Sequence, residues 1–346
     1  MIKSSDIGFY EDSLNYILDV QSEDGSICWE KNMKLDPWDH VEAAMGLSVG
    51  GHYKAAKQAF KWMKNTQQED GSWFAEYKEG KPSSSRKESN FTAYIATGVW
   101  HYYLITKDKD FLIEMFPVIQ KAIGFVLSLQ TAEGDINWAK EDNAILDDSL
   151  ITGCSSIYKS IDCAKAIYKV LDYDFMPLSK ANSLLKNCLL SSPERFDRSW
   201  KSKSRYSMDW YYPVMCGVVT GKEGIERINR RWDEFIVQEL GCKCVEEEPW
   251  VTIAESSELV IALAALGMTD KAIALFDCLH QWKDKKDNLY WTGYVYTDNK
   301  YWPIEKPTWT AAAVLLAADT VYELTDGSEL FLREWGEEKY AKVELS

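Results

Sequence analysis

The chain has 346 residues, of which 46% are hydrophobic and 27% are charged, the balance of an ordinary globular protein. Its formal net charge of -15 argues against nucleic acid and anionic membrane surfaces as partners, because both repel an acidic protein. No stretch reaches the ~18 uninterrupted apolar residues of a membrane span, and the N-terminus lacks the apolar run of a signal peptide. We therefore expect a soluble, cytoplasmic protein without membrane or nucleic-acid partners, and the oligomeric state stays open.

Eight cysteines are scattered along the chain, most of them inside apolar helical runs. Only Cys242 and Cys244 lie close together, and no second pair with histidine completes a zinc-like ligand set. We expect reduced thiols, as in a cytoplasmic protein. No metal and no organic cofactor is called for.

Helical periodicity dominates the chain from end to end. Tyr10, Leu14, Ile17 and Leu18 form the apolar face of the first helix. We expect helices over residues 10–18, from 39 onward, and over 52–63, 90–105, 111–129, 150–171, 177–190, 208–219, 224–237, 255–266, 270–282 and 307–322, with a short helix near the C-terminus. These are about twelve helices in pairs, with almost no alternating strand pattern.

A polar turn with the pattern Gln-x-x-Asp-Gly-Ser follows two of these helices, beginning at Gln21 and Gln67. A weaker version begins at Gln130 and a degraded one at Gln281, and each turn precedes a tryptophan. Repeated helical hairpins need neighbours to bury their apolar faces. We therefore predict an all-α fold, a single (α/α)6 toroid over residues 1–346. Its inner helices point at a common funnel, and no sheet is larger than a hairpin.

The densest cluster of polar and aromatic residues opens the second helix, at Asp36, Trp38, Asp39 and His40. Pro37 disfavours helical geometry at Asp36, so the loop turns into a helix near Asp39. Asp39 alone is explained equally well as a helix N-cap. Its neighbours instead favour a sugar site, where an acid–base group lies beside a flat apolar platform.

Three further acid-plus-aromatic clusters each precede a helix of the inner type. They contain Arg205, Tyr206, Asp209, Trp210 and Tyr211; then Trp250, Glu255 and Glu258; and finally Trp291, Tyr294, Trp302 and Trp309. Flat rings stack on the apolar faces of sugars, while carboxylates and arginine bond the hydroxyls. A single tryptophan is more often packing, and Glu255 could merely favour its helix N-terminus. Four clusters at matching places predict an oligosaccharide or polysaccharide substrate.

The glutamine turns resemble those of the terpene cyclase and protein prenyltransferase superfamily, and those of (α/α)6 glycosidases. Protonating cyclases carry an Asp-x-Asp-Asp motif, and the nearest match here has Ile145 in place of its first acid, ahead of Asp147 and Asp148. Diphosphate-ionising relatives need metal-binding Asp clusters or a basic pocket, which the sequence lacks, as it lacks a prenyltransferase zinc set. A cyclase- or prenyltransferase-like protein is kept as an alternative.

Together the motifs resemble a family of small bacterial (α/α)6 proteins that includes the hydrolase of methylmannose polysaccharides. The resemblance implies an inverting glycoside hydrolase acting on an α-linked oligo- or polysaccharide, such as an α-mannoside or methylated mannose polymer. It also implies a catalytic set of an Asp pair three residues apart and a late Glu. Asp36, Asp39 and Glu255 match that set, with Glu258 open as an equivalent of Glu255.

Inverting hydrolysis needs a protonated carboxylic acid and an opposing carboxylate, ~6.5–9.5 Å apart, with a water between them. We expect Glu255 to be the acid, because burial beside Trp250 raises a carboxyl pKa. Asp39 or Asp36 is then the base, exposed at a polar mouth, and Asp209 binds hydroxyls or orients water. A non-catalytic carbohydrate-binding protein would keep the aromatics without needing opposed carboxylates.

Overall fold

The structure is a computed structural model that describes residues 3–336, and the described chain contains thirteen α-helices. They are α1 (Glu11–Val20), α2 (Pro37–Val49), α3 (Tyr53–Thr66), α4 (Ser89–Thr106), α5 (Lys109–Leu127), α6 (Ile151–Val170), α7 (Met176–Ser191), α8 (Ser207–Met215), α9 (Gly221–Arg230), α10 (Trp232–Phe235), α11 (Ile253–Ala265), α12 (Thr269–Leu279) and α13 (Thr308–Tyr322). None of the helices in residues 3–336 is long and apolar enough to cross a bilayer.

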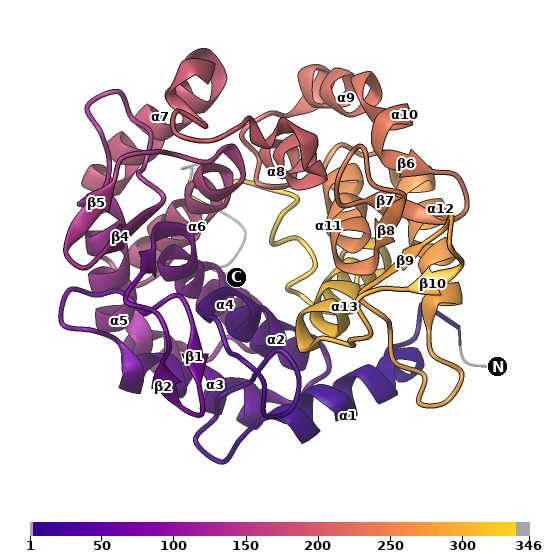
Figure 1. Ribbon diagram of the computed structural model, residues 1–346. Coiled ribbons are helices and arrows are strands. Elements are labelled where there is room, and N and C mark those ends of the chain that lie inside the picture. The colour runs from indigo at the N-terminus through magenta and orange to yellow at the C-terminus, as the bar shows by residue number, and fades with distance from the viewer. Residues whose placement is uncertain (1–2, 337–346) are drawn as a thin grey trace, which may run out of the picture.

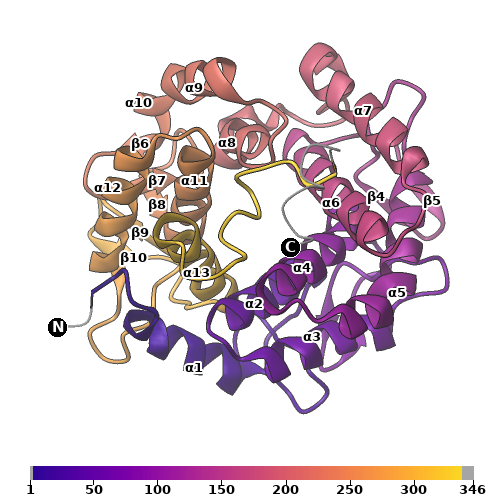
Figure 2. The same ribbon diagram turned by 180° about the vertical axis from the view of Figure 1, so that it is seen from behind.

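Six of the helices form a closed inner ring in the order α2, α4, α6, α8, α11 and α13 (Figure 1). Each packs against the next, and α13 returns to pack against α2. Helices α1, α3, α5, α7, α9 and α12 lie outside this ring, as the view from behind also shows (Figure 2). The predicted (α/α)6 toroid is confirmed.

The difference between inner and outer helices follows from their sequences. All 13 residues of α2 are buried, including its acidic residues and its histidine. The outer helix α3 instead buries only one stripe, at Ala56, Ala59, Phe60, Trp62 and Met63. A helix that is apolar all round belongs in the centre, whereas a striped helix covers the outside.

The predicted glutamine turns join neighbouring hairpins through a repeated pair of hydrogen bonds. The side-chain amide of Gln67 donates to Gly71 O within its own turn and to Val118 O on α5, each at 2.9 Å. The same pattern links Gln21 to Gly25 O and Ala55 O, and Gln130 to Gly134 O and Ala181 O. Gly71 has φ +91°, and a Cβ there would lie 2.2 Å from Lys121 O. Only glycine therefore fits this turn.

The prediction that no sheet exceeds a hairpin is wrong. A three-stranded sheet joins β3 (Lys87–Glu88), β4 (Ala139–Glu141) and β5 (Ala144–Leu146), and a separate hairpin pairs β1 (Tyr77–Lys78) with β2 (Lys81–Pro82). A five-stranded antiparallel sheet has the order β10 (Lys300–Tyr301), β9 (Gly293–Val295), β8 (Trp250–Thr252), β7 (Gly241–Lys243), β6 (Ile236–Val237). Strands of two or three residues are too short to show an alternating pattern. They tie together loops that precede different inner helices.

Some predicted elements also differ in their limits. The helix expected over 224–237 is broken at Arg231, so that α9, α10 and strand β6 share this stretch. The turn at Gln281 does not repeat the others, since its amide donates to Glu239 O and Cys278 O. The short C-terminal helix is absent from residues 325–336, which form turns, and 337–346 lie outside the described residues.

The cysteines are free thiols, as expected. Five of the eight are buried, among them Cys154 and Cys163, whose thiol pKa burial raises to about 12. Burial in apolar surroundings keeps such thiols protonated and unreactive, so they act as packing residues.

Candidate active site

Three inner helices carry a carboxylic acid at their third residue. These are Asp39 on α2, Asp209 on α8 and Glu255 on α11, and we call them the mouth carboxyls. Consecutive helices of the hairpins alternate in direction, so the inner helices share one direction and begin at the same end of the ring. Each of the three residues is nevertheless less than a tenth exposed, at 9%, 5% and 6%.

Asp39 forms a close pair with Asp36, the N-cap residue of α2. Asp36 Oδ1 accepts the Asp39 backbone N–H at 2.9 Å. Burial, followed by the charge of Asp36 and a hydrogen bond between the two carboxyls, raises the pKa of Asp39 well above its usual range. The expectation that this pair lies exposed at a polar mouth is wrong, because Asp36 is only 8% exposed. The pair therefore holds a proton under conditions where ordinary carboxyls are ionised.

Glu255 lies in the first turn of α11, close to Cys244, the residue that follows strand β7. Burial and then the charge of Glu255 raise the pKa of the Cys244 thiol, so the two groups are close neighbours. Within the described chain, no nitrogen or hydroxyl donor bonds the Glu255 carboxyl oxygens. The Cys244 thiol, a weak donor, is its one hydrogen-bonding neighbour among the described residues, so most of its acceptor capacity is available to a water or a ligand.

Asp209 occupies the same position on α8, which lies opposite α2 in the ring (Figure 1). Burial, followed by repulsion from Asp197, raises its pKa to about 7, against the attraction of Arg227 and Arg231. Arg227 does not bond the carboxyl, because its guanidinium donates to the main-chain oxygens of Asp209 and Trp210, at 2.8 and 2.7 Å. The described residues supply no hydrogen bond to the Asp209 carboxyl.

One turn below Asp39, Glu42 is enclosed by donors. Trp38 Nε1 and Tyr94 Oη donate to Glu42 Oε2 at 3.1 and 3.2 Å, and the two rings stack at 4.5 Å with an angle of 10°. Burial raises the pKa of Glu42 to about 7, while the hydrogen bonds from Tyr94 and Trp38 oppose the shift.

One turn below Glu255, Glu258 is enclosed in the same way. The hydroxyls of Tyr211 and Tyr212 donate to its two oxygens, the second at 2.6 Å. Burial and then the charge of Glu42 raise the pKa of Glu258 well above its usual range. We call Glu42 and Glu258 the floor carboxyls. The Trp38 and Tyr212 rings, 5.9 Å apart, join α2 to α8 at this depth.

Two of the predicted binding residues are held by main-chain groups instead. His40 is fully buried, its Nδ1 accepting from the Ile27 N–H at 3.1 Å and its Nε2 lying 2.9 Å from Ala59 O. Burial lowers its pKa to about 4. Trp210 is 2% exposed and donates to Arg227 O at 2.9 Å. Both side chains hold the inner helices to their surroundings.

The aromatic residues of the last cluster pack on one another around the five-stranded sheet. Trp291 stacks on Tyr301 at 4.9 Å, and Tyr294 stacks on Trp282 at 4.3 Å. Trp302 differs from these residues, because 56% of its surface is exposed.

The remaining predicted residues lie between these groups. Arg205 forms an ion pair with Glu247 and lies over the ring of Tyr206 at 5.5 Å. Trp309, at the start of α13, stacks on Trp29 at 6.0 Å. Trp250 is half-buried at the start of β8 and packs edge-on against Trp302. The structure thus gathers acids at the helix starts and aromatics on the sheet beside them.

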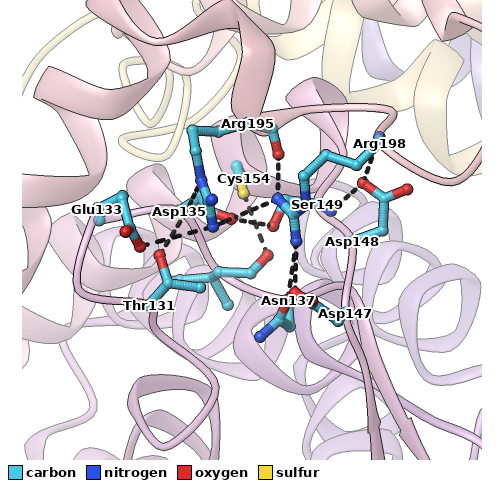
Figure 3. A network of polar contacts seen from close by, with 12 residues as sticks. Thr131, Glu133, Asp135, Asn137, Asp147, Asp148, Ser149, Cys154, Arg195 and Arg198 are labelled. Carbon is cyan, nitrogen blue, oxygen red and sulfur yellow. Dashed lines mark hydrogen bonds and ion pairs between the residues drawn. The ribbon is translucent and has the colours of Figure 1, made fainter.

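The last acid of the cyclase-like motif, Asp148, has a structural role (Figure 3). Asp148 accepts the main-chain N–H groups of Ser149, Arg198 and Ser199, and the hydroxyl of Ser199, at 2.6–2.9 Å. Burial raises its pKa, but these bonds outweigh it and hold the pKa below its usual value. Asp147 occupies the place of the motif's central acid, the one that protonates the alkene in such cyclases. Its side chain is 83% exposed and forms an ion pair with Arg198 at 2.7 Å. A carboxyl in solvent is not enclosed with an apolar polyene, so this motif does not support the cyclase alternative.

Sequence reasoning missed Glu42, Tyr94 and Tyr212. A usable signal was present for the first, because Glu42 follows Asp39 by three residues just as Glu258 follows Glu255. Residues three apart share a helix face. The tyrosines carried no comparable signal, since their partners are far away in the chain.

No family model matches the sequence. The chain is 44% identical over 315 residues to the MMP endo-(1,4)-3-O-methyl-alpha-D-mannosidase of Mycolicibacterium hassiacum, covering 91% of this chain and 86% of that protein. A wild-type glycosidase superposes with a TM-score of 0.71 at 12% identity, covering 94% of this chain and all of the other. A mannosylglycerate hydrolase of Thermus thermophilus also superposes with a TM-score of 0.71, at 11% identity, over 89% of this chain and 99% of that chain. Both solved structures have the same fold as this chain.

Proposed function

The chain belongs to the family of the MMP endo-(1,4)-3-O-methyl-α-D-mannosidase and is a glycoside hydrolase, and we propose that it cleaves an α-linked mannose polymer by an inverting mechanism. The single observation that carries the mechanism is the set of buried mouth carboxyls at the starts of facing inner helices. We propose a 3-O-methylated mannose polysaccharide as its substrate, supported by the 44% identity to the relative.

In this proposal Asp39 is the general acid. Its raised pKa and its hydrogen-bonded partner Asp36 keep a proton on the pair, and a general acid must be protonated at the working pH. This assignment reverses the roles expected from the sequence, in which the Asp pair was the base. The reversal is supported by the contact between the two aspartates, whose charge repulsion and shared hydrogen bond add to burial in raising the pKa of Asp39.

Glu255 is then the general base. Its carboxyl has no nitrogen or hydroxyl donor from the described residues, so it can accept a proton from water. An inverting enzyme holds its two carboxyls ~6.5–9.5 Å apart, which leaves room for that water. We propose this separation between Asp39 and Glu255 when substrate is bound.

Asp209 supplies a third acceptor, opposite α2, for the hydroxyls of the bound sugar. Its unbonded carboxyl and its pKa of about 7 suit a group that exchanges hydrogen bonds with a ligand. Because the inner ring closes on itself, we treat residues 1–346 as one catalytic domain. We also propose a cytoplasmic location, supported by the eight unpaired thiols.

The test is to incubate the purified protein with 3-O-methylmannose polysaccharide and measure new reducing ends and product length. We expect internal cleavage of this polymer, and none of an α-(1,4)-glucan of matched length. Binding of the polymer without new reducing ends would favour a non-catalytic carbohydrate-binding protein. Absence of both binding and cleavage would contradict the proposal.

A further inference from the structure

Trp302, which follows the edge strand β10, and Trp250, which begins the central strand β8, form a pair that the cleavage mechanism does not use. We propose that this pair is an outer binding subsite for a further sugar unit of the same neutral saccharide chain, away from the bond that is cleaved. The inference rests on the proposed function, and it adds a contact that only a longer substrate can reach.

The first support is exposure. Trp302 is 56% exposed, and no other tryptophan of the described residues is exposed to a comparable extent. Ile304, two residues later, is 71% exposed. An indole left in water contributes little to folding, so an exposed one next to a functional site is typical of a binding surface.

The second support is the rigid backbone beneath the indole. The Trp302 N–H donates to Gly293 O at 3.0 Å, and the Trp302 carbonyl accepts Trp250 Nε1 at 2.7 Å. The two rings meet edge-on at 4.9 Å. A Cβ at Gly293 would lie 2.3 Å from Trp250 Nε1, so glycine makes room for this indole. A platform fixed before binding loses little entropy when a ligand arrives.

The third support is continuity with the mouth. Trp250 is the first residue of β8, and β8 leads directly into α11, whose third residue is Glu255. Three residues of extended strand span about 10 Å, so Trp250 stands off from the start of α11 by about that distance. The pair is therefore placed for a sugar unit outside the reacting one.

The size of the exposed surface favours a saccharide over a protein partner. A stable protein interface uses about 20–30 residues on each side, whereas a sugar ring needs one flat aromatic face. Trp302 provides such a face. Ile304 provides an apolar neighbour that suits O-methyl groups better than bare hydroxyls.

The experiment compares Trp302→Ala and Trp302→Phe with wild type on the polysaccharide and on the shortest oligosaccharide that is cleaved. We expect Trp302→Ala to raise KM for the polysaccharide about 2–10-fold more than KM for the short substrate, as loss of one aromatic contact implies. Trp302→Phe should restore part of the difference. Tyr173→Ala is the control, since Tyr173 is 52% exposed after the last residue of α6, at the opposite end of the ring.

Equal KM changes for the two substrates, or none, would overturn the outer subsite while leaving the proposed function intact. If wild type cleaves neither substrate, the proposed function fails, and the subsite is judged by titrating the polysaccharide against wild type and Trp302→Ala. Weaker binding by the variant would then support the subsite, and equal binding would overturn it.

Discussion

The mouth and floor carboxyls differ in their hydrogen bonding although they lie one helical turn apart. Both layers are buried, and burial raises the pKa of Asp39, Glu42 and Glu258 alike. The floor pair accepts hydrogen bonds from ring groups: Trp38 and Tyr94 donate to Glu42 Oε2, and two tyrosines donate to the two oxygens of Glu258. In the described chain, the mouth residues Asp209 and Glu255 have no such donors.

The contrast shows that burial alone does not identify a catalytic carboxyl. A buried acid whose oxygens are all bonded stabilises the packing around it, because each bond would be costly to break. A buried acid with free acceptors costs stability and is retained where it acts on a ligand. We therefore propose that the mouth carboxyls carry the chemistry and that the floor carboxyls hold the helices that position them.

The largest expected effect is on catalysis at the mouth. Asp39→Asn and Glu255→Gln should each lower kcat by on the order of 10²–10⁴, the usual contribution of a positioned acid or base. Steady-state rates on the polysaccharide measure this loss. A variant of either kind that keeps its rate within a few-fold of wild type would remove that residue from the mechanism.

The next effect concerns stability at the floor. Glu258→Ala leaves the buried hydroxyls of Tyr211 and Tyr212 without their acceptor, at a cost of about 1–3 kcal/mol for each. Denaturant unfolding measures the change. Glu255→Ala, one turn away on the same helix, is the matched control and should not lower the free energy of unfolding. Equal losses of unfolding free energy in the two variants would contradict the difference in hydrogen bonding between the floor and the mouth carboxyls.

The third prediction concerns the pH dependence of stability, which the mouth residue Asp209 is expected to change. Burial raises its pKa from 3.8 to about 7, so between pH 4 and 7 the folded protein binds a proton that the unfolded chain has released. Its contribution to stability is present below about pH 4 and is lost as the pH rises through 7, with a slope of at most about 1.4 kcal/mol per unit.

Asp209→Asn removes this titration, so the variant should gain stability relative to wild type as the pH rises from 5 to 8. Unfolding free energies of both proteins at the two pH values provide the measurement. An identical difference at pH 5 and pH 8 would show that Asp209 is not buried in its protonated form.

The smallest effect lies outside both layers, at the turns that join the hairpins. Gln67→Ala removes two hydrogen bonds to main-chain oxygens and should cost about 1–2 kcal/mol. Gln281→Ala is the control, because its two bonds to main-chain oxygens are exposed to solvent, whereas those of Gln67 are partly buried. Thermal unfolding measures the loss in each variant. Equal losses of stability in Gln67→Ala and Gln281→Ala would contradict a structural role specific to the repeated glutamine turns.

The sequence predicted features that depend on spacing along the chain. The glutamine turns indicated repeated hairpins and hence the toroid, and the cluster at Asp36 and Asp39 marked the start of an inner helix. Features set by distant contacts were not predictable. The burial of the Asp pair depends on surrounding loops, His40 bonds Ile27 and Ala59, and the five-stranded sheet combines short strands from distant loops.

The most direct test of the central claim follows the anomeric configuration of the first product by proton NMR. If Asp39 protonates the leaving oxygen and Glu255 activates a water on the opposite face, cleavage of the α-linked polymer must release a β-anomer first. Mutarotation then converts it toward the equilibrium mixture. An α-anomer as the first product would require a covalent intermediate and a closer carboxyl pair, and it would contradict the one-water arrangement.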